Sequence, residues 1–113
     1  MASVIDMNAF ENLKQMAGAD FIGELINTFL DDAPQLIQQL HSALVVNDAE
    51  SFRRAAHSLK SNAASFGANH LSGLAKELEM LGRENKLDEV GDRLKTLEEA
   101  YQAAALELKG MAS

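Results

Sequence analysis

The chain alternates between stretches with apolar residues at helical spacing and short polar breaks. In most of these stretches the apolar residues recur at i, i+3, i+4 and i+7, which places them on one face of an amphipathic helix. This pattern predicts four long helices, over about 33–46, 48–66, 69–83 and 87–109. Four such helices joined by short turns favour an all-α fold, an antiparallel up-down-up-down four-helix bundle.

One or two further helices are expected before these four and should pack across one end of the bundle. Asp6 or Asn8 can cap a short first helix, which Gly18 ends. A second helix is expected to begin near Asp20. Since both segments precede the long helices, they would form a cap rather than part of the four-helix layer.

The long helices carry recognisable start signals. Asp32 is expected to cap the first of them, with Pro34 in its first turn, where a missing amide costs little. Asp48 is expected to cap the second and Asn69 the third. Asp88 should open the last.

The apolar residues of the segment after Asp20 spread over an unusually wide arc of the helix, roughly 180° at about 100° per residue. They are Phe21, Ile22, Leu25, Ile26, Phe29 and Leu30. Two interpretations stay open. The arc can be a partly exposed docking surface for a partner, or it can be buried on both flanks where the short first helix covers the bundle.

Composition narrows the class of protein. A chain of 113 residues suits one domain, expected over 1–113, with enough length to bury its own core. The net charge of −7 argues against nucleic-acid binding, and no apolar run approaches the length of a membrane span. Without cysteines there are no disulfides, and the first residues do not resemble a signal peptide, so we expect a cytoplasmic protein.

His57 stands apart from the apolar stripe of its helix. It lies roughly 140° from Phe52 around the helix axis, on the side opposite the predicted core. Its neighbours at i+3, i+4 and i+7 are Lys60, Ser61 and Ala64. Two of these are short, so the imidazole should stand clear of its surroundings. A lone exposed histidine usually has no special role, so the order of the residues around it must decide.

The segment around His57 resembles the signature of histidine-containing phosphotransfer (HPt) domains, H-x-L-K-G followed by small residues, a hydrophobic residue and Gly. The matching residues are His57, Leu59, Lys60, Ala63, Ala64, Phe66, Gly67 and Ala68. Ser61 stands where Gly is frequent, and Asn62 where Ser is frequent. Because serine is still small, the space around the imidazole remains.

The resemblance implies a phosphorelay intermediate of two-component signal transduction. Such a carrier accepts a phosphoryl group on its histidine, here His57, from a receiver-domain aspartate and passes it to another. Neutral imidazole is a nucleophile near pH 7, and Nε2 is its less hindered nitrogen. Lys60 could stabilise the phosphoryl charge or orient an acidic partner.

The same resemblance implies the partners and the absence of a resident cofactor. The partners would be receiver domains of response regulators or hybrid histidine kinases, and the receiver supplies Mg²⁺. The chain lacks a Gly-rich nucleotide loop, which fits a phosphoryl carrier rather than a kinase. The alternative is a non-catalytic helical adaptor that binds receiver-like partners.

Docking is expected on the histidine face and the adjoining helix. The candidate residues are Ile22, Leu25, Arg53, Ser61 and Ala64. A monomer is expected, because the four apolar stripes can cover one another within one chain.

The remaining polar residues suggest no second site. His41 and His70 lack the motif context and should be solvated, and no spacing of histidines and acids suits a metal site in a bundle. The acidic residues of the last two helices should be solvated too: Glu77, Glu79, Glu84, Glu98 and Glu99. An approach of Glu79 to His57 across a helix pair is conceivable but not expected.

Overall fold

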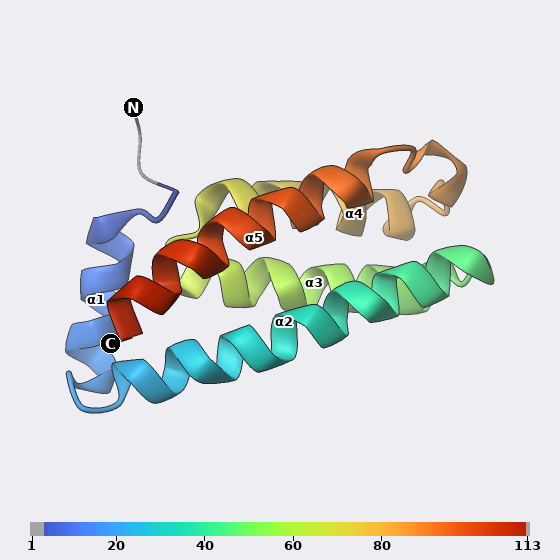
Figure 1. The fold of residues 1–113 in the computed structure, drawn as a ribbon. Coiled ribbons are helices and arrows are strands. Elements are labelled where there is room, and N and C mark those ends of the chain that lie inside the picture. The colour runs from blue at the N-terminus through green and yellow to red at the C-terminus, as the bar shows by residue number, and fades with distance from the viewer. Residues whose placement is uncertain (1–3, 113) are drawn as a thin grey trace.

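The computed structural model describes residues 4–112, and this part of the chain is helical without strands. Its elements are α1 (Met7–Ala17), α2 (Ile22–Val45), α3 (Ala49–Ser65), α4 (Asn69–Arg83), the 3₁₀ turn η1 (Leu87–Glu89) and α5 (Arg93–Ala112). Helices α2 to α5 lie side by side in an elongated bundle, and α1 crosses one end of it (Figure 1). The predicted all-α bundle is confirmed.

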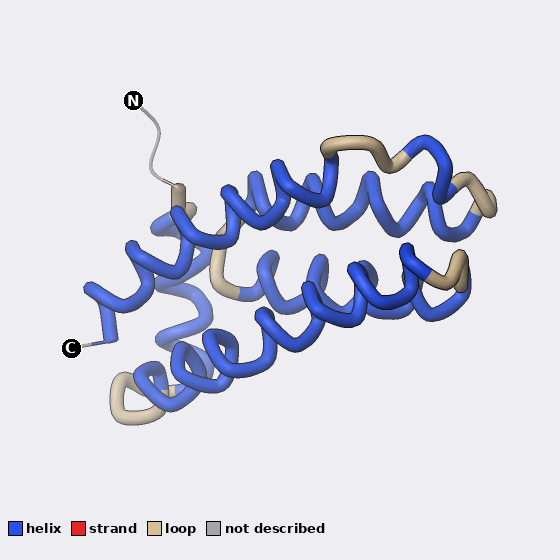
Figure 2. Tube along the Cα trace, turned by 45° about the vertical axis from the view of Figure 1, so that its right-hand side comes forward, coloured by secondary structure: helices blue, strands red, loops and turns tan. Residues whose placement is uncertain are grey.

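The connections between the long helices are short, as Figure 2 shows. Helix α2 packs against α3 and α5, and α4 packs against the same two helices. The four long helices therefore close a ring around one core. Among the described helices, none is both long and apolar enough to cross a membrane.

Helix α2 is one continuous element where the sequence pattern predicted two. The segment after Asp20 and the segment 33–46 merge, so Asp32 and Pro34 lie inside the helix and Asp32 is not a cap. Only α1 is left to cross the end of the bundle. Proline suits the first turn of a helix, which is why the pattern predicts a start here, but the surrounding structure accommodates Pro34 within α2.

The accommodation of Pro34 involves a neighbouring helix. Proline has no amide to donate to the carbonyl four residues earlier, which here belongs to Leu30. The hydroxyl of Tyr101 on α5 donates to that Leu30 oxygen at 3.4 Å. This long hydrogen bond supplies the donor that the proline lacks, so the interruption does not leave a bare carbonyl in the bundle.

Two of the predicted helix caps are confirmed by hydrogen bonds. The Asp6 side chain accepts from the backbone amide of Asn8 at 3.0 Å at the start of α1, and Gly18 ends that helix with φ 95°. Asp48 accepts from the amide of Ser51 at 3.1 Å and caps α3.

Two other predicted starts are wrong. Asn69 is the first residue of α4 rather than its cap, and its side chain donates to the Asp6 carboxylate at 3.2 Å. Asp88 lies in η1, and α5 begins only at Arg93, because the chain turns at Gly91 with φ 52°.

Gly67 fixes how the end of α3 meets the start of α1. Its φ of 79° favours glycine, and a Cβ at this position would lie 2.5 Å from the Asp6 carbonyl oxygen. The Asp6 amide donates to the Gly67 carbonyl at 2.7 Å. A larger residue here would therefore separate α1 from the end of the histidine helix.

The core is formed by the apolar stripes of all the helices. The largest fully buried side chains are Phe52, Ile5, Ile26, Leu40, Leu59, Leu71, Leu78, Leu97, Leu108 and Val90. Each large aliphatic side chain contributes about 1.5–3 kcal/mol by leaving water, before its loss of entropy is counted. Because α3 contributes Phe52 and Leu59 to this core, its opposite face is fixed toward the solvent.

Candidate functional site

His57 is displayed on the outer face of α3, as its position in the sequence predicted. Its side chain is 55 % exposed, while Ala56 and Leu59 on either side of it in the sequence are buried. Ser61 and Ala64 are exposed and leave the space beside the imidazole open. The histidine is therefore accessible without a change of fold.

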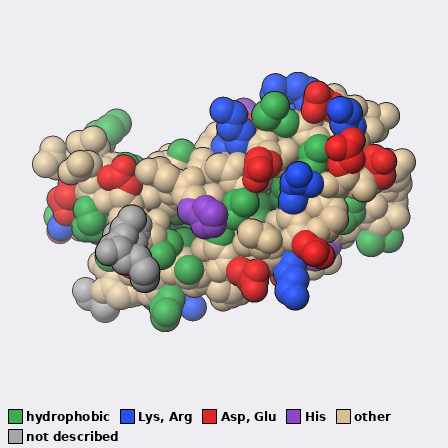
Figure 3. All heavy atoms as spheres, turned by 90° about the horizontal axis from the view of Figure 1, so that it is seen from above, with side chains coloured by type: hydrophobic (Ala, Val, Ile, Leu, Met, Phe, Trp, Pro, Cys, Tyr) green, Lys and Arg blue, Asp and Glu red, His purple; other side chains and the backbone are tan. Residues whose placement is uncertain are grey.

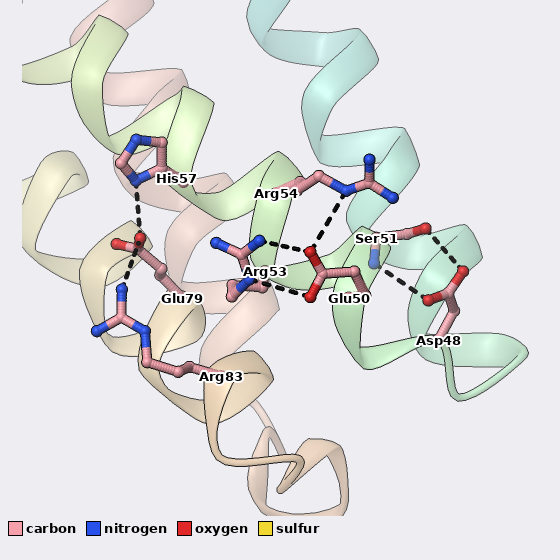
Figure 4. Close-up of polar contacts among 8 residues, drawn as sticks. All are labelled: Asp48, Glu50, Ser51, Arg53, Arg54, His57, Glu79 and Arg83. Atoms are coloured by element: carbon pink, nitrogen blue, oxygen red, sulfur yellow. Dashed lines mark hydrogen bonds and ion pairs between the residues drawn. The ribbon is translucent and has the colours of Figure 1, made fainter.

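Glu79 on α4 reaches across to His57 and forms the centre of a polar network. Its Oε2 lies 2.7 Å from Nδ1 of His57, and its Oε1 accepts from Nζ of Lys60 at 2.6 Å. Arg83 of the same helix donates to Oε2 at 3.3 Å (Figure 4). Glu79 is only 2 % exposed, so the expectation that it is solvated is wrong.

The approach of Glu79 to His57, which was conceivable from the sequence but not expected, is present in the structure. Helical periodicity shows which face of each helix is apolar, but not which turn of α4 lies opposite which turn of α3. The only signal in the sequence is an acidic residue on the helix that follows the histidine helix. Without the register between the two helices, this signal does not distinguish Glu79 from Glu77.

The charge of Glu79 determines which nitrogen of His57 carries the proton. Burial by itself would raise the pKa of the Glu79 carboxyl, but the hydrogen bonds from Lys60 and His57 hold that pKa below its ordinary value. The group is therefore an ionised carboxylate, which can only accept hydrogen bonds. It takes the Nδ1–H of His57, which leaves the lone pair on Nε2.

Nε2 of His57 lies on the ring edge that is turned away from Glu79 (Figure 4). This geometry gives one unprotonated nitrogen on the exposed edge of the ring and one protonated nitrogen on the anchored edge. The side chain is thus oriented by its protein contact and open at its reactive atom.

Lys60 differs from its predicted state. We expected it to be available to a bound phosphoryl group, whereas its side chain is 28 % exposed and its ammonium is bonded to Glu79. Its role toward a phosphoryl group stays a prediction. In the structure it is a countercharge for the buried carboxylate.

Arg53 is half-buried and engaged along its own helix. Its Nε donates to Glu50 at 3.2 Å, and Glu50 also pairs with Arg54 (Figure 4). This second network lies along α3 between His57 and the cap at Asp48. Arg53 is therefore on the histidine side of the molecule, as predicted, but already has a partner.

The predicted docking residues of α2 separate into two groups. Ile22 is 8 % exposed and Ile26 is fully buried, so for these two residues the docking interpretation is wrong and the buried interpretation holds. Both belong to the core of the bundle, and α1 packs against α2 and α3 at this end. Leu25 is half-buried, and Phe21 is 58 % exposed.

Leu25 lines a groove of about 250 Å³ where α1, α2 and α3 meet. The full lining comprises Leu13, Leu25, Thr28, Phe29, Asp32, Asn62, Ser65 and Phe66. Asn62 and Ser65 bring this groove to the turns of α3 that follow His57. An apolar hollow therefore lies on the same helix as the displayed imidazole.

The other polar residues form no comparable site. His41 of α2 pairs with Glu98 of α5, a surface contact that the sequence did not predict. Within residues 4–112, no group of three or more His, Cys, Asp or Glu side chains could hold a metal ion.

The structure is a four-helix bundle in which the exposed imidazole of His57 is held at Nδ1 by a buried carboxylate. The chain belongs to the Hpt domain family, whose family model matches residues 24–107. It is 28 % identical to the phosphorelay protein LuxU of Vibrio vulnificus over 88 % of this chain and 87 % of that protein.

Two further relatives agree with this assignment. The sensor protein TorS of Escherichia coli is 32 % identical over 66 % of this chain, which corresponds to 8 % of that protein. The crystal structure of histidine-containing phosphotransfer protein B of Pseudomonas aeruginosa superimposes with a TM-score of 0.92, at 28 % identity, over 99 % of this chain and 96 % of that one. The chain is a phosphorelay intermediate of two-component signalling.

Proposed function

We propose that His57 is the residue that carries the phosphoryl group and that Nε2 is the atom that binds it. The observation that carries this proposal is the contact between Nδ1 of His57 and the buried carboxylate of Glu79. It leaves the lone pair on the exposed nitrogen, where an incoming phosphorus can be reached. His41 and His70 have no such buried partner among the described contacts.

The reaction follows from this protonation state. The Nε2 lone pair attacks the phosphorus of an aspartyl phosphate on a receiver domain, an N–P bond forms, and the P–O bond to the aspartate breaks with its electrons on the carboxylate. No proton has to leave Nε2, because the ring proton is on Nδ1. The ring gains positive charge as the N–P bond forms, and the Glu79 carboxylate stabilises that charge.

In this proposal the chain is a phosphoryl carrier without kinase activity and without a cofactor of its own. The receiver brings the phosphorylated aspartate and Mg²⁺. The Mg²⁺ ion would balance the negative charge of the phosphoryl oxygens. The name of one relative, a phosphorelay protein, supports the role of phosphoryl carrier. The reverse reaction returns the phosphoryl group to the aspartate of a second receiver.

The receiver would dock over the exposed face of α3 and the groove beside it. Ser61 and Ala64 give access to His57, Arg53 lies at the other edge, and Leu25 lines the hollow. We withdraw Ile22 from this surface because it is buried. The proposal includes a monomeric chain, since the helices bury one shared core within the chain, and a cytoplasmic location.

The test is transfer from a receiver domain that has been phosphorylated on its aspartate. The wild-type chain should acquire acid-labile, base-stable phosphate, and peptide mass spectrometry should assign it to His57. H57Q should stay unlabelled while unfolding at nearly the wild-type temperature, because the imidazole is outside the core. H70Q is the matched control, since His70 is also an exposed helical histidine.

Two results would contradict the proposal. One is label that persists in H57Q. The other is the absence of label from the wild-type chain with every receiver of a broad panel, combined with tight binding to some of them, which would favour the adaptor.

A further inference from the structure

Helices α3 and α4 come very close together one turn away from the histidine site. Gly82 of α4 is buried, and a Cβ built on it would lie 3.0 Å from the N, Cα and Cβ atoms of Arg53 on α3. Two of these three atoms are backbone atoms, which cannot rotate aside as a flexible side chain can. Even an alanine at position 82 would therefore require α3 and α4 to shift relative to each other by a few tenths of an ångström.

A second contact joins the same helices on the other side of the site. The hydroxyl of Ser72 on α4 donates to the backbone carbonyl of Lys60 on α3 at 3.0 Å. Along α3 the order is Arg53, His57, Lys60, and along the antiparallel α4 it is Ser72, Glu79, Gly82. The two contacts thus flank the pair formed by His57 and Glu79.

The network around Glu79 depends on the separation of these helices. Both of its oxygens are engaged by α3, at 2.7 Å to His57 and 2.6 Å to Lys60, so a rotation of the carboxylate toward one donor weakens its bond to the other. Arg83 lies on α4 with Glu79 and moves with it. If α4 receded, Arg83 would keep its hold on Oε2 while His57 lost it.

We propose that Gly82 is a positioning residue for phosphotransfer: its missing side chain, together with the Ser72 hydroxyl, sets the separation and register of α3 and α4 at which Glu79 fixes the tautomer of His57. The inference rests on the proposed role of His57. Gly82 touches neither the imidazole nor a substrate. It would act only through Glu79, by keeping the proton on Nδ1 of His57.

The test compares G82A with G73A, a glycine-to-alanine change on the same helix at an exposed position where a Cβ meets nothing within 4 Å. The ¹⁵N NMR signals of the His57 ring report which nitrogen is protonated, and a phosphorylated receiver reports the rate of phosphoryl uptake. G73A should match the wild-type chain in both. G82A should show a mixture of tautomers and take up phosphate about tenfold more slowly, since small misplacements of a reacting group cost about that much.

S72A provides a milder version of the same change, because it removes one hydroxyl without adding an atom. It should shift the tautomers and the rate in the same direction as G82A, by a smaller factor. Circular dichroism shows whether each variant is folded. Should G82A fail to fold, S72A decides the question.

The proposal is overturned if folded G82A keeps the wild-type ring signals or the wild-type uptake rate. It is equally overturned if G82A does not fold and S72A behaves as G73A does. The ring signals need no phosphoryl donor, so a wild-type chain that takes up no phosphate would refute the proposed function, while the comparison of tautomers would still test Gly82.

Discussion

At the scale of single residues, Glu79 is a buried acid that remains charged because donors surround it. Lys60, His57 and Arg83 all contribute hydrogen bonds to its two oxygens. An unpaired carboxylate at such a position would take up a proton instead. The two cations balance its charge, and the histidine receives the directional contact that orients the ring.

Replacement of Glu79 should separate the effect of its charge from that of its acceptor oxygen. E79Q keeps an oxygen for the Nδ1–H of His57 but loses the charge, and we expect phosphoryl uptake about tenfold slower, since charge-assisted hydrogen bonds are roughly twice as strong as neutral ones. E79A removes the acceptor as well and should be slower still. Single-turnover transfer from a receiver measures both.

The control for these variants is E77Q, which removes an exposed carboxylate from the same helix. It should leave the rate unchanged. Equal rates for E79Q, E79A and the wild-type chain would show that the contact with Glu79 does not assist the reaction.

The lowered pKa of Glu79 makes a prediction for stability against pH. Its folded-state pKa lies below the ordinary value of 4.5, so its stabilising contribution is complete above that pH and is lost as the pH falls through the folded pKa. Denaturant unfolding of wild type and E79Q from pH 7 to pH 2 should therefore give curves that converge in acid. Asp48 and Glu50 also have lowered pKa values, so the free energy of unfolding of E79Q should still fall with pH, although less steeply than that of the wild type.

The outcome that contradicts this prediction is a constant difference between the two proteins across the whole range. That result would mean that the ionisation of Glu79 is not linked to folding.

The residues of the site differed in how far they could be predicted. His57, Ser61 and Ala64 are exposed because the helical period places them opposite Phe52, and this information is local to one helix. Glu79 could not be found in this way, because its role depends on the register between two helices. Ile22 was misjudged for a similar reason, since its burial depends on how the helices pack around it.

At the scale of the elements, α2 shows a tertiary contact overriding a local signal. Pro34 ordinarily marks the first turn of a helix or a kink. Here Tyr101 donates to the carbonyl that the proline leaves without a partner, and α2 continues from Ile22 to Val45. The continuity places the half-buried Leu25 and the core residues Ile37 and Leu40 on a single rigid element.

A double-mutant cycle between Tyr101 and Pro34 should measure this dependence. Y101F leaves the Leu30 carbonyl without its donor, which costs about 1–3 kcal/mol for a buried group. In the P34A background the new amide can bond Leu30, so the same Y101F change should cost much less. Urea denaturation of the four proteins gives the coupling, and an equal cost in both backgrounds would show that the hydroxyl is not compensating for the proline.

At the scale of the whole molecule, the surfaces have different characters. On the face that shows α4 and α5, most charged side chains gather toward the end that carries the connection between these helices (Figure 3). A partner that docked at this end would have to desolvate charged side chains of both signs, which costs free energy. The groove between α1, α2 and α3 is lined largely by apolar side chains and lies beside the histidine helix, which favours it for docking.

Truncation of a groove side chain should weaken receiver binding without altering the chemistry. L25A removes apolar contact area from the hollow, and we expect roughly 5- to 30-fold weaker binding, the usual cost of a well-packed interface residue. V45A is the matched control, because Val45 is on the same helix and 84 % exposed at its other end. Calorimetric titration with a receiver domain measures both, and equal affinities would move the docking surface elsewhere.

The overall architecture was predictable because it depends on properties that each segment carries by itself. The helices are indicated by their apolar stripes, by the caps at Asp6 and Asp48 and by the turn glycines. The number of helices was correct except that α2 was divided in two. The start of α5 was misplaced because η1 continues the apolar pattern of that helix without sharing its axis. What the pattern lacks is the relative placement of helices, and the site depends on that placement.

The bond between Tyr101 and Leu30 also constrains how this sequence can change over generations. A lineage that replaced Pro34 would restore the backbone donor and release Tyr101 to vary, whereas a lineage that first lost the tyrosine hydroxyl would pass through a less stable protein. The two positions should therefore be inherited as a pair, with the proline exchanged before the tyrosine. Among diverging descendants, an aromatic hydroxyl at the α5 position should accompany the α2 proline more often than chance allows.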